Sequence, residues 1–143
     1  MSSPLARQNR NLAESALVAT HQALSHATRV DLLASAIHTI LARHAPAGDL
    51  VCLDVGCGDF TLSGKIGAIA GGQGRVHTWH GVDLYPLDDA RRNDPAWTRY
   101  RQFDGACLPL DDASIDVVLM CDMLHHASPD QQVALAREAA RIC

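Results

Sequence analysis

The sequence predicts an α/β fold in which a mostly parallel sheet is flanked by helices. Short apolar segments bounded by turn residues alternate with helical patterns from residue 50 to residue 143. The first apolar segment, residues 50–55, is almost continuously apolar, which is typical of a strand buried on both faces of a sheet. The chain before it is rich in alanine and carries a helical pattern.

The helical pattern covers residues 12–45 and ends at Pro46 and Gly48, which both break helices. Its first half, residues 12–27, is less periodic, and we expect a separate helix there. Its second half has apolar residues at the spacing of one helical face. These residues are Val30, Leu33, Ala34, Ile37, Ile40 and Leu41.

Strand and helix patterns then alternate. Residues 60–70 follow the first strand and predict a helix with Leu62, Ile66 and Ile69 on one side. Residues 87–97 are polar and predict a short helix or a loop. Three further strands are expected within residues 75–84, 98–104 and 114–124.

The last helix has the clearest start signal in the chain. Ser128 is placed to cap it, Pro129 suits the first helical position, and Gln131 completes a capping box. The residues after this start predict a wide apolar face on the helix. That face comprises Val133, Leu135, Ala136, Ala139, Ala140 and Ile142.

Composition excludes several classes of function. The net charge of −4 argues against broad electrostatic binding to nucleic acid or acidic membranes. The five cysteines are scattered, without the Cys/His spacing of a zinc site, and they suit buried thiols in a reducing compartment. The sequence has neither a signal-peptide pattern nor an apolar run long enough to span a bilayer. We therefore expect a cytoplasmic protein without a metal site.

Acidic residues or glycines follow each expected strand. Asp54, Gly56 and Gly58 lie at the end of the first strand, and Asp83, Asp104 and Asp122 end the later ones. Ligands of open α/β sheets bind beyond the carboxyl ends of the strands. Asp83 lies 25 residues after Gly58, near the roughly 20-residue spacing at which an acid reaches a ribose hydroxyl pair.

The glycine turn does not fit a dinucleotide such as NAD. A dinucleotide fingerprint needs glycine or alanine at its last position, where this turn has Thr61. Asp59 would also lie close to a pyrophosphate, which is an unfavourable pairing of charges. The turn instead suits a ligand with a nucleoside and little negative charge, and NAD binding remains a weaker alternative.

Four segments in order resemble the class I S-adenosylmethionine-dependent methyltransferases, particularly those that act on small molecules. The segments read LDVGCG, GVDL, FDGACLPL and DASIDVVLMCDMLHH. The resemblance implies a Rossmann-like sheet with strand order 3-2-1-4, the first four of the family's usual seven strands. It divides the chain into a helical extension, residues 1–45, and an S-adenosylmethionine-binding domain, residues 46–143, without the last three strands.

The resemblance also implies the roles of the site residues. Gly56 and Gly58, with Cys57 between them, would make room for the methionine part of S-adenosylmethionine, with Asp54 near its amino group. Asp83 would bind the ribose hydroxyls, with Leu84 beside it. The remaining expected cofactor contacts are Asp104 at the adenine amino group, Gly105 and Ala106 beside the ring, and Cys121 and Asp122 near the sulfonium.

The expected function is methyl transfer from S-adenosylmethionine to a small molecule. Asp122, His125 and His126 are the candidates for a general base, which is needed only if the acceptor must lose a proton. The alternative is a binding module without turnover, or a subunit or fragment of a larger methyltransferase. Asp104 also has a simpler interpretation as a turn residue before Gly105.

Two departures from the family pattern matter. Phe60 occupies the position of a frequent third glycine, and the sequence covers only part of the family's sheet. The fourth strand would then form an apolar edge, and such edges pair readily with other chains. We therefore expect a truncated domain or a homodimer formed through this edge.

A basic and aromatic stretch between the second and third strands is open to two interpretations. It contains Arg91, Arg92, Trp97, Arg99, Tyr100 and Arg101. It resembles a nucleic-acid contact, but interleaved aspartates favour a solvated face. We do not expect nucleic acid as a partner.

Overall fold

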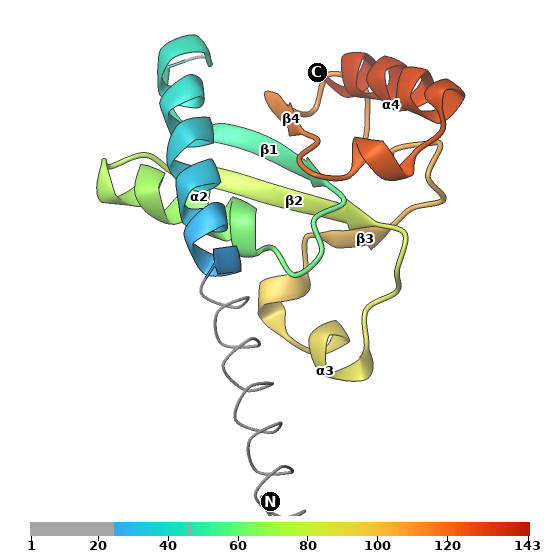
Figure 1. Cartoon of the computed structure of the whole chain (residues 1–143), viewed down its shortest axis with the longest axis horizontal. Coiled ribbons are helices and arrows are strands. Elements are labelled where there is room, and N and C mark those ends of the chain that lie inside the picture. Colours follow the sequence, from blue (N-terminus) through green and yellow to red (C-terminus); the bar gives the residue numbers. More distant parts are fainter. Residues whose placement is uncertain (1–24, 46) are drawn as a thin grey trace, which may run out of the picture.

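The computed structural model describes residues 25–45 and 47–143. Within these residues four strands form a sheet in the order β3-β2-β1-β4, and all three pairings are parallel (Figure 1). The predicted α/β class and strand order are confirmed. The strands are β1 (Leu50–Val55), β2 (His77–Asp83), β3 (Tyr100–Gln102) and β4 (Val117–Leu119).

The helices follow the predicted order. A helix covers residues 25–44, and the expectations for residues 1–24 lie outside the described residues. The polar segment between β2 and β3 forms two short helices rather than one element. The labelled helices are α2 (Thr61–Gly72), α3 (Asp89–Arg92), η1 (Pro95–Trp97), η2 (Leu124–His126) and α4 (Pro129–Ile142).

Each face of the sheet is covered by a different set of helices. On one face, Ala34 and Leu41 of helix 25–44 pack with Ile66 of α2 against apolar strand residues. On the other face, Leu135 and Ile142 of α4 pack against strand residues that include Leu53 and Val82. Figure 1 shows helix 25–44 beside α2 and away from α4. β1 is therefore buried on both faces, as its apolar sequence predicts, whereas Arg101 and Gln102 of the edge strand β3 are exposed.

Two apolar faces are narrower than predicted. Ile40 is 58% exposed, because it lies one residue, or about 100° around the helix, from the buried Leu41. On α4, Leu135 and Ile142 are buried, whereas Val133 is 51% exposed. Ala136 and Ala140 are exposed as well. Only part of the predicted apolar face is therefore buried, since the sheet contacts one stripe of α4.

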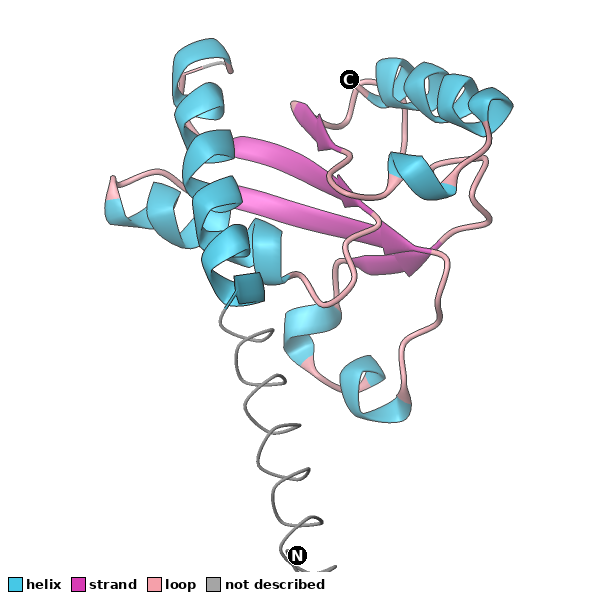
Figure 2. Cartoon of the chain, viewed as in Figure 1, coloured by secondary structure: helices cyan, strands magenta, loops and turns pink. Residues whose placement is uncertain are grey.

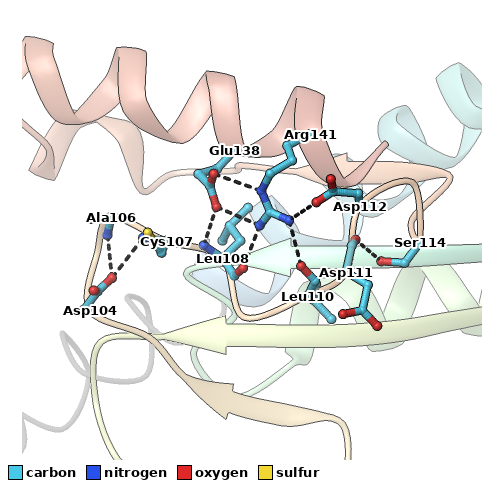
Figure 3. Close-up of polar contacts among 10 residues, drawn as sticks. All are labelled: Asp104, Ala106, Cys107, Leu108, Leu110, Asp111, Asp112, Ser114, Glu138 and Arg141. Atoms are coloured by element: carbon cyan, nitrogen blue, oxygen red, sulfur yellow. Dashed lines mark hydrogen bonds and ion pairs between the residues drawn. The ribbon is translucent and has the colours of Figure 1, made fainter.

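The connection from β3 to β4 is fixed to α4 by Arg141 (Figure 3). The Arg141 guanidinium donates to the carbonyls of Leu108 and Leu110, each at 3.0 Å, and to the Asp112 carboxylate at 2.6 Å. It also makes a bidentate pair with Glu138, whose carboxylate accepts from the Leu108 N–H at 2.9 Å. This connection contains no helix in the described structure, so these bonds replace helix packing.

The carboxyl ends of the strands point to the same side of the molecule, where the loops that follow them gather (Figure 2). The parallel register requires this arrangement. The helices of the described residues are too short or too polar to cross a bilayer.

Candidate functional site

The loop after β1 brings the backbone close to neighbouring loops. Gly56 and Gly58 have φ values of 75° and 52°, which glycine adopts at no steric cost. The Gly56 N–H donates to the Val82 carbonyl of β2 at 2.8 Å. A Cβ on Gly56 would lie 2.8 Å from the Cβ of Met123, in the loop after β4. Only glycine therefore fits between these two strand ends.

Phe60, at the position of the absent third glycine, keeps a glycine-like backbone. Its φ of 62° lies in the left-handed region, which costs a non-glycine residue roughly 1–2 kcal/mol. Its ring lies over Gly81, where a Cβ would come within 2.2 Å of it. The ring also makes edge contacts with Trp97 and Tyr100, at centroid distances of 5.2 and 6.4 Å. Packing of the Phe60 ring thus stabilises a left-handed backbone at this position, which a glycine would adopt without strain.

Asp54, near the end of β1, is a buried carboxyl group and only 3% exposed. Burial raises its pKa to about 6, the Ser63 hydroxyl lowers it in part, and the charge of Asp83 raises it. Among the described residues, no cationic side chain acts on the Asp54 carboxylate. Asp54 is therefore suited to pair with a cationic group of a ligand.

Asp83, at the end of β2, links two loops. Its Oδ2 accepts from the Gly58 N–H at 3.0 Å, and its Oδ1 accepts from the Tyr85 N–H at 3.4 Å. These bonds hold the carboxylate beside the glycine turn. A carboxylate has about four acceptor positions, so further positions remain for hydroxyl donors of a ligand.

Asp104, after β3, organises its own turn. Its Oδ1 accepts from the N–H groups of Ala106 and Cys107, at 2.8 and 3.0 Å, and these bonds hold its pKa below the usual value. Asp104 also lines a pocket together with Gly105. Both interpretations offered for this residue, as a turn residue and as a pocket residue, are thus compatible with its position.

The end of β4 places Asp122 between two elements. Asp122 has a φ of 58° and forms an ion pair with Arg29 of helix 25–44. The Nδ1 atom of His125 lies 4.0 Å from the Asp122 carboxylate, and the ring centroids of His125 and His126 lie 3.8 Å apart with the rings tilted by 43°. A non-glycine residue in this backbone region is uncommon and often marks a functional site.

Three pockets adjoin one another along the carboxyl ends of the strands, and we call them together the trough. Their volumes are about 150, 400 and 250 Å³. The first and second share Leu84, Phe103, Met123 and His126, and the second and third share Gly56 and Asp122. The acids at the four strand ends all line the trough, in the order Asp104, Asp83, Asp122 and Asp54.

The trough includes most of the residues singled out in the sequence, but not all of them. Cys57 and Cys121 line its third pocket, whereas Gly58, Ala106 and His125 line none of the three pockets. Burial raises the pKa of the Cys57 thiol to about 12, so this group stays protonated near neutral pH.

The structure adds residues that sequence reasoning missed. His26 and Arg29 of helix 25–44 line the third pocket, and Tyr85 lines the second. His26 and Arg29 are polar residues three positions apart, a pattern that is common on exposed helix faces and does not mark a site. Their position over the strand ends depends on how the helix packs, which sequence spacing does not report.

The profile of a protein family described as "Methyltransferase domain" matches residues 53–143. The chain belongs to this family. Its matched part begins at Leu53 in β1 and includes the loops that form the trough, apart from the residues of helix 25–44. A comparison with curated proteins gave no significant match.

Solved structures of methyltransferases share the fold of this methyltransferase domain. One is the Burkholderia thailandensis 1,6-didemethyltoxoflavin-N1-methyltransferase, with bound 1,6-didemethyltoxoflavin and S-adenosylhomocysteine. It is 19% identical with a TM-score of 0.57, and the match covers 99% of this chain and 60% of that one. Another is a Methanococcus maripaludis protein assigned as an S-adenosyl-L-methionine-dependent methyltransferase. It is 20% identical with a TM-score of 0.50, and the match covers 74% of this chain and 48% of that one.

Proposed function

We propose that this methyltransferase domain binds S-adenosylmethionine in the trough and transfers its methyl group to a small-molecule acceptor. The observation that carries the proposal is the order of acids along the trough. Asp104 and Asp83 line the part suited to a nucleoside, and Asp54 is buried at the opposite end. A ligand with adenosine at one end and a cationic amino acid at the other matches this order.

The adenosine part would lie in the first two pockets. We propose that adenine packs between Leu84 and Leu135, beside Gly105, with its amino group toward Asp104. The ribose hydroxyls would donate to Asp83, whose carboxylate is already oriented by Gly58. The narrow first pocket and its apolar side chains suit a flat ring better than a phosphate.

The methionine part would lie in the third pocket, with its amino group toward Asp54. Gly56 would let the ligand approach the backbone, and Cys57 and Cys121 would form part of the walls. The Asp59 carboxylate also lines this pocket and accepts from the Thr61 N–H at 3.0 Å. Asp54 and Asp59 are not paired with Arg29, unlike Asp122, so the pocket favours a cationic ligand and opposes a pyrophosphate; this supports S-adenosylmethionine over NAD.

S-adenosylmethionine supplies a methyl group on a sulfonium, which is a good leaving group. The chain's own contribution would be alignment of the acceptor with that group, and such proximity supplies roughly 7–11 kcal/mol. Asp122 and His126 line the trough where acceptor and donor would meet, so we propose them as the groups that orient the acceptor or take its proton. His125 would act only after a side-chain movement, because it lies outside the three pockets.

A small-molecule acceptor is supported by the Burkholderia neighbour, a 1,6-didemethyltoxoflavin-N1-methyltransferase whose structure holds 1,6-didemethyltoxoflavin. The chain spans about half to three fifths of the length of the Methanococcus and Burkholderia proteins. Turnover by this chain alone is therefore part of the proposal.

The alternative is a cofactor-binding module or a subunit of a larger methyltransferase. It is favoured by the edge of the sheet: among the described residues, β4 pairs only with β1. We propose that this edge pairs with another strand, in a second copy of the chain or in additional sequence. Size-exclusion chromatography with light scattering tests the homodimer, and a monomer that persists at high concentration contradicts it.

We also propose a cytoplasmic location. All five cysteines are free thiols, and Cys107 and Cys143 are exposed. Exposed free thiols suit a reducing compartment.

Isothermal titration calorimetry with S-adenosylmethionine, S-adenosylhomocysteine and NAD tests the proposal. We expect binding of the first two ligands and weaker or no binding of NAD. Asp83→Ala should weaken S-adenosylhomocysteine binding at least about tenfold, since it removes two hydrogen bonds to a ribose. Asp111→Ala is the matched control, because Asp111 is an exposed aspartate outside the trough. Absence of binding by the first two ligands contradicts the proposal. If they bind, a methyl-transfer assay separates an enzyme from a binding module.

A further inference from the structure

Helix 25–44 forms one wall of the third pocket of the trough. His26, Arg29, Val30 and Leu33 line this pocket opposite the loops that follow β1 and β4. A ligand in the pocket would therefore be enclosed between the helix and the strand ends.

Apolar packing, a hydrogen bond and two ion pairs attach the helix to the rest of the domain; the hydrogen bond joins His38 Nε2 and Gln73 Oε1 at 3.1 Å. The apolar residues of the helix, such as Ala34 and Leu41, pack on α2 and the sheet. Asp31 forms an ion pair with Lys65 of α2 at 2.5 Å. Arg29 forms an ion pair with Asp122, at the end of β4. Of the two ion pairs, only the one between Arg29 and Asp122 lines the trough.

Asp122 occupies a particular place in the trough. It lines both the second and the third pocket, and the only other residue that does so is Gly56 among the described residues. In the proposed ligand orientation, the sulfonium joins the nucleoside to the amino acid, so it would lie at this junction. Asp122 would therefore be the carboxylate beside the reacting centre, and Arg29 contacts it from the helix.

We infer that Arg29 is a positioning residue that fastens helix 25–44 over bound S-adenosylmethionine through its ion pair with Asp122. The inference rests on the proposed function. The ion pair fixes the Asp122 carboxylate at the junction of the two pockets, and it closes the third pocket on the side of the helix. Arg29 acts through Asp122 and needs no contact with the acceptor.

The physical basis is a change in solvation when the pocket fills. The side chains of Arg29 and Asp122 are 57% and 59% exposed, so the ion pair contributes little to folding of the unliganded domain. A ligand beneath the pair displaces water and lowers the local dielectric constant, which strengthens the attraction. The ion pair should therefore stabilise the ligand complex more than the free protein, and this difference is a coupling between the helix and the ligand.

A double-mutant cycle with S-adenosylhomocysteine as the probe tests this inference. The variants are Arg29→Ala, Asp122→Asn and the two combined. Asparagine tolerates the left-handed backbone of residue 122, so Asp122→Asn removes the charge and keeps the loop. Each single variant should weaken binding about threefold to tenfold and speed dissociation, and the double variant should resemble the single ones. Arg29→Lys should restore part of the loss.

Lys65→Ala is the matched control, because it breaks the other exposed ion pair of the same helix, away from the trough. It should leave affinity and dissociation rate unchanged. Additive losses in the double variant, an equal loss in Lys65→Ala, or no rescue by Arg29→Lys would each overturn the inference. Thermal unfolding of the unliganded variants should match the wild type, and a large loss there would show a purely structural role.

Failure of this inference is distinguishable from failure of the proposed function. If the wild type binds S-adenosylhomocysteine and Asp83→Ala weakens that binding, the trough is the cofactor site whatever the cycle shows. If the wild type does not bind it, the proposed function fails, and the inference fails with it.

Discussion

The buried carboxyl group of Asp54 leads to a specific pH dependence of cofactor binding. Burial raises its pKa to about 6, whereas the cofactor's amino group needs an ionised partner. With this pKa, about one tenth of the unliganded protein has Asp54 ionised at pH 5 and about nine tenths at pH 7. Affinity for S-adenosylhomocysteine should therefore rise roughly tenfold, or about 1.4 kcal/mol, between these pH values.

The charges of Asp54 and the ligand's amino group explain why affinity rises with pH. An ammonium group beside Asp54 favours the carboxylate, so binding lowers the pKa of Asp54 and releases protons near pH 6. Calorimetric titrations in buffers with different ionisation enthalpies measure both the affinity and the protons released. Asp54→Asn is the control, since it keeps the shape of the side chain and removes its titration.

Asp54→Asn should bind more weakly at pH 7 and lose most of the pH dependence between pH 5 and 7. Histidines that line the trough are present in both proteins, so the difference between the two isolates Asp54. The reasoning is refuted if the wild type binds equally well at pH 5 and 7, or if Asp54→Asn keeps the full pH dependence.

The same pKa affects folding of the unliganded protein. Because the folded-state pKa of Asp54 is raised from 3.8 to about 6, the contribution of this group to stability is present below pH 4 and is lost as the pH rises to 6. Above pH 6 the free energy of unfolding is therefore about 3 kcal/mol lower than below pH 4 because of this group. Asp54→Asn should therefore be more stable than the wild type at pH 7, and denaturant unfolding at pH 4 and pH 7 measures the difference.

The remaining predictions concern packing and caps. Gly81→Ala should destabilise the fold by about 3 kcal/mol, because its Cβ would meet the Phe60 ring at 2.2 Å. Adding Phe60→Gly should restore part of this stability in denaturant unfolding, and a fully stable Gly81→Ala would contradict the packing. Arg141→Met should increase hydrogen exchange of residues 108–112, since it removes the bonds that fix this connection to α4; unchanged protection would count against that role. Ser128→Ala should cost about 1 kcal/mol by removing the capping box of α4, with an unchanged unfolding midpoint as the opposing result.

Elements with local signals were predicted closely. The strand expected at residues 50–55 is β1 (Leu50–Val55), and the capping box of Ser128 and Gln131 is present at the start of α4. These signals depend on residues close together in the sequence, namely an apolar run and a cap three residues from its partner. The strand order was implied by the resemblance to the methyltransferases, and the observed order β3-β2-β1-β4 confirms it.

Features that depend on distant residues were not predicted. The compatibility of Phe60 with the glycine turn rests on Gly81 and on two aromatic rings from another part of the chain. The ion pair between Arg29 and Asp122 joins residues 93 positions apart. Neither pairing has a signature in sequence spacing, since each arises only when the helices pack on the sheet.

The residues expected to form the site lie close together, but their contacts with a ligand stay predictions. The acids at the strand ends line the trough because parallel strands bring their carboxyl ends together. Gly58 and Ala106 were expected to contact the ligand, but their N–H groups donate to Asp83 and Asp104. Their roles as direct contacts, and the division of the chain at residue 45, stay predictions.

The most direct test of the central claim is a crystal structure of the domain grown with S-adenosylhomocysteine. We predict the ligand in the trough, with adenine beside Gly105, the ribose hydroxyls on Asp83 and the amino group on Asp54. A ligand bound elsewhere, or in the trough with the amino group at Asp104 and adenine at Asp54, would contradict the account.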